Sequence, residues 1–182
     1  MSYYFTILSP TDVPLFSLTF GTSKAGGDGI ARFRFPESAQ YMNQFVVHAS
    51  LDIVEEAQWT NGALYLKHID TYPPTASHVS AFLTPSGSRL ILLHQPPQLQ
   101  SSGGVTGSTA SLATATTTSR ASSSSIAANP TSPQTEEAIR QFMNEVYENW
   151  VKTVMSPFYR QGMQITSPVF RARVTAAGRK WL

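Results

Sequence analysis

The sequence contains no cysteine. This absence excludes disulfides, zinc sites with cysteine ligands, thiol catalysis and palmitoylation of this chain. Residue 2 is Ser2, so N-myristoylation, which needs a glycine at that position, is excluded as well. No apolar run reaches the length that spans a bilayer, and the N-terminus lacks the basic region of a signal peptide. We therefore expect a soluble cytoplasmic protein.

Charge is also scarce. Only 13% of the residues are Asp, Glu, Lys or Arg, and the net charge is +2. The sequence thus lacks the dense basic patches that mark nucleic-acid binding, and no nucleic-acid partner is expected. Apolar residues, in contrast, are plentiful. They make up 41% of the 182 residues, which is enough for the core of one domain covering residues 1–182.

Five segments have the pattern of β-strands. The segment 15–20 alternates apolar and polar residues, as a strand with one buried face does. Turn-forming residues separate the segments, for example the Thr-Pro-Ser-Gly run at 84–87. We predict strands at 3–9, 15–20, 64–70, 78–83 and 89–94.

Three segments have features of helices. The first covers 38–56 and begins with a serine that suits an N-cap. The second covers 136–155, where apolar side chains recur at spacings of three and four. The third covers 167–177; it opens with Ser-Pro, which favours a helix start, and is followed by Gly178 as a stop signal.

The segment from Gln95 to Gln134 differs from the rest of the chain. It consists mainly of Ser, Thr, Ala, Gly, Pro and Gln, with Arg120 as its one charged residue. Such a segment cannot bury enough apolar surface to offset the entropy lost on ordering. We predict a disordered low-complexity insertion at 95–134, within a single α+β domain built on an antiparallel sheet.

No arrangement of residues predicts an enzyme. The four histidines are scattered along the sequence, and neither a metal-binding H-E-x-x-H nor a G-x-S-x-G nucleophile sequence is present. We therefore expect no catalytic residues, no metal and no cofactor. A small enzyme with an unrecognised site is kept as an alternative.

Several short sequences, in this order and spacing, resemble those of the sedlin family, small subunits of the vesicle-tethering complex TRAPP (transport protein particle). They are Asn43-Gln44-Phe45, His48-Ala49, Leu51-Asp52, Leu64-Tyr65-Leu66-Lys67, Ser80-Ala81-Phe82, Leu93-His94, Pro157-Phe158-Tyr159, and Gly178 with Lys180. The resemblance implies a longin-like fold, with a five-stranded antiparallel sheet, one helix on one face and two on the other.

The resemblance also implies a function. Sedlin-like proteins are non-catalytic adaptors that bind other TRAPP core subunits and help to attach the large subunits of the bigger complexes. TRAPP acts in transport from the endoplasmic reticulum to the Golgi, where it promotes nucleotide exchange on Rab-class GTPases. A cytoplasmic protein, associated peripherally with these membranes through the complex, is therefore expected. An alternative from the same fold class is a longin-type regulatory domain of a fusion or coat protein.

The first predicted helix has more apolar surface than one buried stripe requires. His48 and Asp52 lie in a narrow polar strip between two apolar faces. One face consists of Met42, Phe45, Val46, Ala49 and Ile53, and the other of Val47, Leu51 and Val54. Because a longin-like helix covers its sheet with one face only, we expect a partner protein on the second.

The predicted partner-binding site has an apolar core and a polar rim. The core is Val47, Leu51 and Val54, and the rim is His48, Asp52 and Glu55. Asp52 is the position at which the resemblance implies attachment of a large subunit. Leu90 and Val174 are further candidates, for which core packing and an interface are equally open. The basic residues Arg171, Arg173, Arg179 and Lys180 are most simply a solvated helix face, with contact to anionic lipid or an acidic partner as the alternative.

Overall fold

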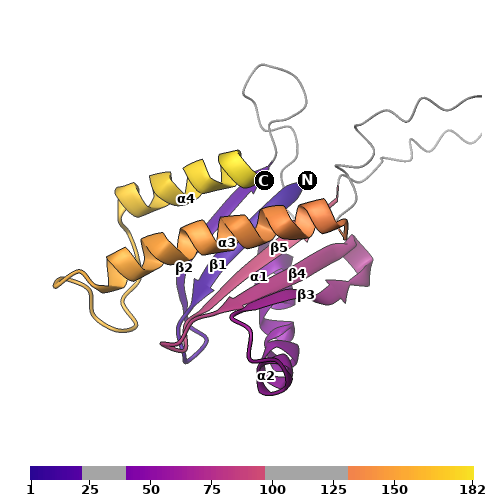
Figure 1. Ribbon diagram of the computed structural model, residues 1–182, viewed down its shortest axis with the longest axis horizontal. Coiled ribbons are helices and arrows are strands. Elements are labelled where there is room, and N and C mark those ends of the chain that lie inside the picture. Colours follow the sequence, from indigo (N-terminus) through magenta and orange to yellow (C-terminus); the bar gives the residue numbers. More distant parts are fainter. Residues whose placement is uncertain (22–39, 97–130) are drawn as a thin grey trace, which may run out of the picture.

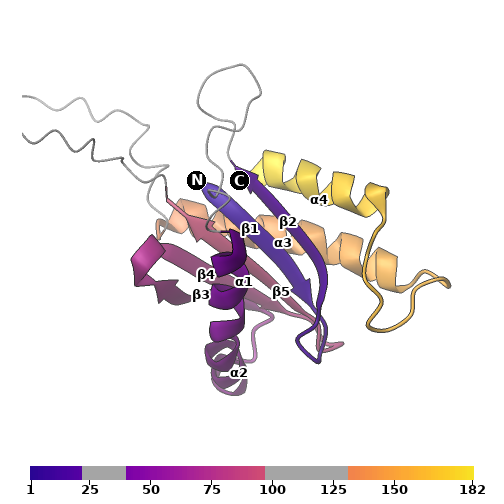
Figure 2. The same ribbon diagram turned by 180° about the vertical axis from the view of Figure 1, so that it is seen from behind.

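The computed structural model describes residues 1–21, 40–96 and 131–182. In this part of the chain, a five-stranded antiparallel sheet lies between two helical layers (Figures 1 and 2). The α+β, longin-like fold predicted from the sequence is confirmed. One layer contains α1 (Gln40–Ala49) and α2 (Leu51–Thr60), and the other α3 (Pro133–Val154) and α4 (Pro168–Trp181).

The sheet has the strand order β2-β1-β5-β4-β3. Every residue of the inner strand β1, which lies between β2 and β5, is buried, because helices cover both of its faces. The edge strand β2 instead alternates between buried and more exposed residues along much of its length. The strands are β1 (Ser2–Leu8), β2 (Pro14–Gly21), β3 (Tyr65–Tyr72), β4 (Ser77–Leu83) and β5 (Arg89–Gln95), and the 3₁₀ turn η2 (Pro73–Thr75) joins β3 to β4.

The side chains on the two faces of the sheet form two separate cores. On the face covered by α3 and α4, Phe5 of β1 meets Phe142 of α3 edge to face, with ring centroids 5.4 Å apart. On the face covered by α1 and α2, Tyr4 belongs to the same cluster as Val54 and Leu93. Because successive side chains of β1 point to opposite faces of the sheet, this strand contributes to both cores.

The first predicted helix is interrupted at Ser50, so α1 and α2 replace one continuous helix. Ser50 is fully buried, and its hydroxyl donates a hydrogen bond to the carbonyl oxygen of Val47 at 2.8 Å. Hydrogen bonds of this kind, from a serine to the preceding turn, often bend helices. The predicted N-cap at residue 38 lies outside the described residues.

The insertion predicted at 95–134 overlaps the end of β5 and the start of α3, so it is too long at both ends. Gln95 is the last residue of β5, and its side-chain amide donates to the carbonyl oxygen of Thr75 at 2.7 Å. Ser132 caps α3, since its hydroxyl oxygen accepts a hydrogen bond from the backbone N–H of Thr135 at 3.2 Å. The rest of the predicted insertion, residues 97–130, lies outside the described part of the chain. None of the helices in the described ranges is long and apolar enough to cross a membrane.

Candidate partner-binding face

Val47, Leu51 and Val54 do not form the exposed interface core predicted from the sequence. Their exposed fractions are only 1%, 8% and 0%, and they belong to the core between the helices α1 and α2 and the sheet. Helical periodicity identified two apolar faces but could not decide which of them meets the sheet. The prediction chose the wrong face.

Leu90 and Val174 are buried as well. Each has an exposed fraction of 0%, and both belong to the core on the opposite face of the sheet, under α3 and α4. Of the two possibilities left open by the sequence, core packing therefore applies to both. Neither side chain is at the surface to contact a partner of the folded chain.

The polar residues of the predicted site lie where they were expected. His48, Asp52 and Glu55 are all exposed on the outward side of α1 and α2. In the part of the chain that the structure describes, no hydrogen bond or ion pair engages the Asp52 carboxylate. Because Asp52 lies in the first turn of α2, its charge also interacts favourably with the dipole of that helix.

Large aromatic side chains share this outward side. Tyr41, Phe45 and Trp59 have exposed fractions of 71%, 58% and 86%. With His48 and Asp52 they follow helical spacings of four, three, four and seven residues, so they lie in one row. We call Tyr41, Phe45, His48, Asp52 and Trp59 the outer stripe.

The break at Ser50 does not disrupt this row. Ser50 keeps a right-handed helical conformation, with φ −79° and ψ −10°. Its N–H donates to the carbonyl of Val46 at 3.1 Å, and the N–H of Val54 donates to its carbonyl at 3.0 Å. The helical register therefore continues from α1 into α2. An exposed row that combines aromatic rings with a carboxylate has the composition of a protein interface, where aromatic residues are the usual anchors.

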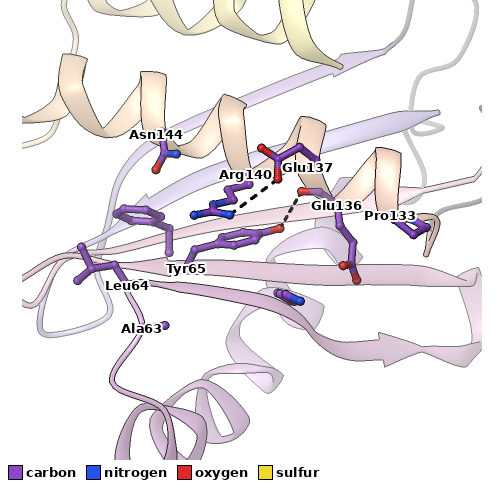
Figure 3. A pocket seen from close by; sticks show the side chains of 10 residues that line it. Ala63, Leu64, Tyr65, Pro133, Glu136, Glu137, Arg140 and Asn144 are labelled. Carbon is purple, nitrogen blue, oxygen red and sulfur yellow. Dashed lines mark hydrogen bonds and ion pairs between the residues drawn. The ribbon is translucent and has the colours of Figure 1, made fainter.

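A second surface feature is a cavity of about 630 Å³ between β3 and α3 (Figure 3). Tyr65 forms part of its floor, and the Tyr65 hydroxyl donates to the backbone carbonyl of Glu136 at 3.4 Å. Burial, together with the nearby Glu136 carboxylate, raises the pKa of Tyr65 to about 12. Arg140 pairs with Glu137 at 3.8 Å on the rim. The lining combines charged side chains, such as Lys67 and Glu136, with apolar ones, such as Leu64 and Phe82.

Comparisons with known proteins agree with the resemblance seen in the sequence. The family model described as Sedlin matches residues 7–180. The chain belongs to the sedlin family. It is 30% identical over 182 residues to the "Transport protein particle 20 kDa subunit" of Schizosaccharomyces pombe, covering all of both chains. It is 31% identical over 180 residues to the "Probable trafficking protein particle complex subunit 2" of Caenorhabditis elegans, covering 99% of this chain and 96% of the relative.

In this member of the sedlin family, three of the histidines that are scattered in the sequence lie side by side. His78 pairs with His94 across β4 and β5, and their rings stack with centroids 5.3 Å apart. His68 of β3 lies on the other side, with its Nε2 atom 2.9 Å from Nδ1 of His78. Burial and the neighbouring His68 lower the pKa of His78. Within the described residues, no three His, Cys, Asp or Glu side chains are arranged to hold a metal ion.

The aromatic residues of the outer stripe were not identified as site residues from the sequence. The signal was present in the spacing. Tyr41 lies eleven residues before Asp52, Phe45 lies seven residues before it, and Trp59 lies seven residues after it. These spacings put all four residues on one side of a helix. The sequence spacing alone therefore puts Tyr41, Phe45 and Trp59 on the side of the helix that carries Asp52.

Proposed function

We propose that this chain is a non-catalytic adaptor subunit of the TRAPP tethering complex in transport between the endoplasmic reticulum and the Golgi. In this role it joins small core subunits to large subunits, and it supports nucleotide exchange on a Rab-class GTPase by the whole assembly. The chain is peripheral to the membrane at these compartments. Membership of the sedlin family supports this proposal, as do matches over 96–100% of the length of relatives that are named as particle subunits.

The outer stripe is the proposed attachment site for a large subunit. The observation that carries this assignment is the exposed row that Tyr41, Phe45 and Trp59 form with Asp52. The aromatic rings supply the apolar contact area, and the carboxylate selects a partner of complementary charge. The proposal keeps His48, Asp52 and Glu55 in the interface and replaces the buried Val47, Leu51 and Val54 with the exposed aromatic residues.

Affinity purification of the tagged chain from its own cells tests this assignment. Asp52→Tyr is expected to leave the fold intact, because the Asp52 side chain is exposed; the lost helix-dipole interaction amounts to about 0.3–1 kcal/mol. The variant should keep the small core subunits and lose the large ones. Phe45→Ser should have the same effect, because it removes a ring of the outer stripe without a change in charge.

Glu148→Tyr is the matched control. Glu148 is an exposed carboxylate on α3, in the opposite helical layer, and the substitution again replaces a negative charge with an aromatic ring. This variant should recover all subunits. If Asp52→Tyr recovers the large subunits as well as the wild type does, the outer stripe is not their attachment site. If the wild-type chain recovers no TRAPP subunit at all, the proposed function itself is wrong.

A further inference from the structure

The connection between α3 and α4 presents several large apolar side chains to solvent. Met155, Phe158 and Met163 have exposed fractions of 78%, 86% and 45%. Val169, in the first turn of α4, is 58% exposed. We call residues 155–169 the apolar tip. A group of large exposed apolar side chains on one short connection is a candidate contact surface for another molecule.

The apolar tip is a packed structure with a defined orientation. The ring of Tyr159 meets the buried Trp150 edge to face, with centroids 5.9 Å apart. The N–H of Ile165 donates to the carbonyl of Leu15 in β2 at 2.8 Å, and the Ile165 side chain is buried. These anchors hold the backbone on the body of the protein while Phe158, next to Tyr159, faces outward.

The chain segment that carries the apolar tip has charges of one sign. After Glu148 the sequence contains no Asp or Glu, but six cations: Lys152, Arg160, Arg171, Arg173, Arg179 and Lys180. All six are exposed. In the described part of the chain, Lys180 is the one that pairs with a carboxylate, that of Glu145 at 3.0 Å. Arg160 lies in the tip itself, and Lys152 and Arg171 lie in the helical turns next to it.

The position of the apolar tip makes it accessible. It projects past the ends of the strands at one end of the molecule (Figures 1 and 2). It belongs to the α3–α4 layer, whereas the outer stripe lies on the α1–α2 layer across the sheet. Both surfaces can therefore be occupied at the same time.

We propose that the apolar tip docks on a membrane surface that contains anionic phospholipids. Phe158 and Met155 enter the boundary between headgroups and acyl chains, and Lys152, Arg160 and Arg171 contact the phosphates. This order of groups matches a bilayer, in which anionic headgroups lie outside the hydrocarbon. A projecting tip with cations and no carboxylate fits that layered surface better than a protein partner, whose interface usually carries charges of both signs.

Binding of the full chain to lipid vesicles tests the proposal. The probe is flotation with phosphatidylcholine vesicles, with or without about 30% phosphatidylserine. The chain should bind the anionic vesicles and not the neutral ones, and binding should fall when salt rises from about 0.1 M to about 0.5 M. Phe158→Ser should weaken binding roughly tenfold, since it removes one inserted ring. Arg160→Glu should weaken binding more than roughly fivefold, because it reverses a charge near the surface.

Trp59→Ser is the matched control. Trp59 and Phe158 have the same exposed fraction, 86%, so neither substitution opens a cavity in the core. Trp59→Ser should bind vesicles as the wild type does, and thermal melting should be unchanged in both variants. Absence of wild-type binding to anionic vesicles overturns the proposal, as does equal weakening by Phe158→Ser and Trp59→Ser. If Phe158→Ser keeps vesicle binding but loses a protein subunit on purification from cells, the apolar tip is a protein interface instead.

Discussion

Gly178 of α4 lies against the ring of Phe20 in β2. A Cβ atom at Gly178 would stand 2.8 Å from Cε2 of Phe20, closer than carbon atoms normally approach. The ring has little room to move, because it also stacks on Tyr3 with centroids 5.4 Å apart and contacts Phe142 at 5.9 Å. Gly178 was predicted to end the last helix, but α4 continues to Trp181. The glycine is needed for close packing of a helix on a strand.

Gly178→Ala is expected to destabilise the protein. Alanine favours a helix over glycine by about 1 kcal/mol, but forcing a methyl group against Phe20 costs roughly 1–3 kcal/mol. A net loss in the free energy of unfolding should therefore appear in urea denaturation. Gly62→Ala is the control, since a Cβ there would meet no atom within 4 Å and should leave stability nearly unchanged. Recovery of stability in Gly178→Ala combined with Phe20→Ala would confirm the clash, and purely additive losses would refute it.

Ser80→Leu is expected to overpack the core under α3. Ser80 is 1% exposed on β4, on the same face of the sheet as Phe82. Because Ser80 is buried, the larger leucine side chain should crowd its neighbours and lower stability by roughly 1–3 kcal/mol, measured as a lower melting temperature. Ser86→Leu, in the exposed turn between β4 and β5, is the matched control and should melt close to the wild type. An unchanged melting temperature for Ser80→Leu would contradict the packing argument.

Stability is expected to fall on mild acidification because of His78. Burial and the neighbouring His68 lower the pKa of His78 from its usual value of 6.5. Below pH 6.5 the unfolded chain therefore binds a proton on this residue more readily than the folded chain does. The free energy of unfolding should therefore rise with pH through this window. The stability linked to neutral His78 is lost as pH falls from about 6.5 toward the lower folded pKa.

The pH dependence can be assigned to His78 by substitution. The groups around it are His68 and Thr71 of β3 on one side and His94 of β5 on the other. His78→Gln should flatten the change in urea midpoint between about pH 5 and about pH 7. His48→Gln is the control, because His48 lies exposed on α1, and it should keep the wild-type slope. An equal slope in wild type and His78→Gln would show that other groups control this window.

The local pattern of the sequence was sufficient to locate most elements. Hydrophobic alternation, Ser-Pro pairs and turn residues placed each strand and the starts of α3 and α4 within about three residues. These signals are local, because backbone dihedral preferences and side-chain periodicity act over a few neighbouring residues. The same locality explains the errors: a glycine that serves packing resembles a helix stop, and a buried serine that bends a helix leaves no mark in the periodicity.

The sequence alone therefore determined the elements, the absence of cysteine chemistry, the one-signed charge after Glu148 and the presence of two apolar faces on the first helical segment. Only the tertiary structure decided that Val47, Leu51 and Val54 face the sheet while Tyr41, Phe45 and Trp59 lie exposed in one row with Asp52. It also brought His68, His78 and His94 together across three strands. The physical reason is that burial and clustering depend on which distant segments pack together, and no local pattern specifies that choice.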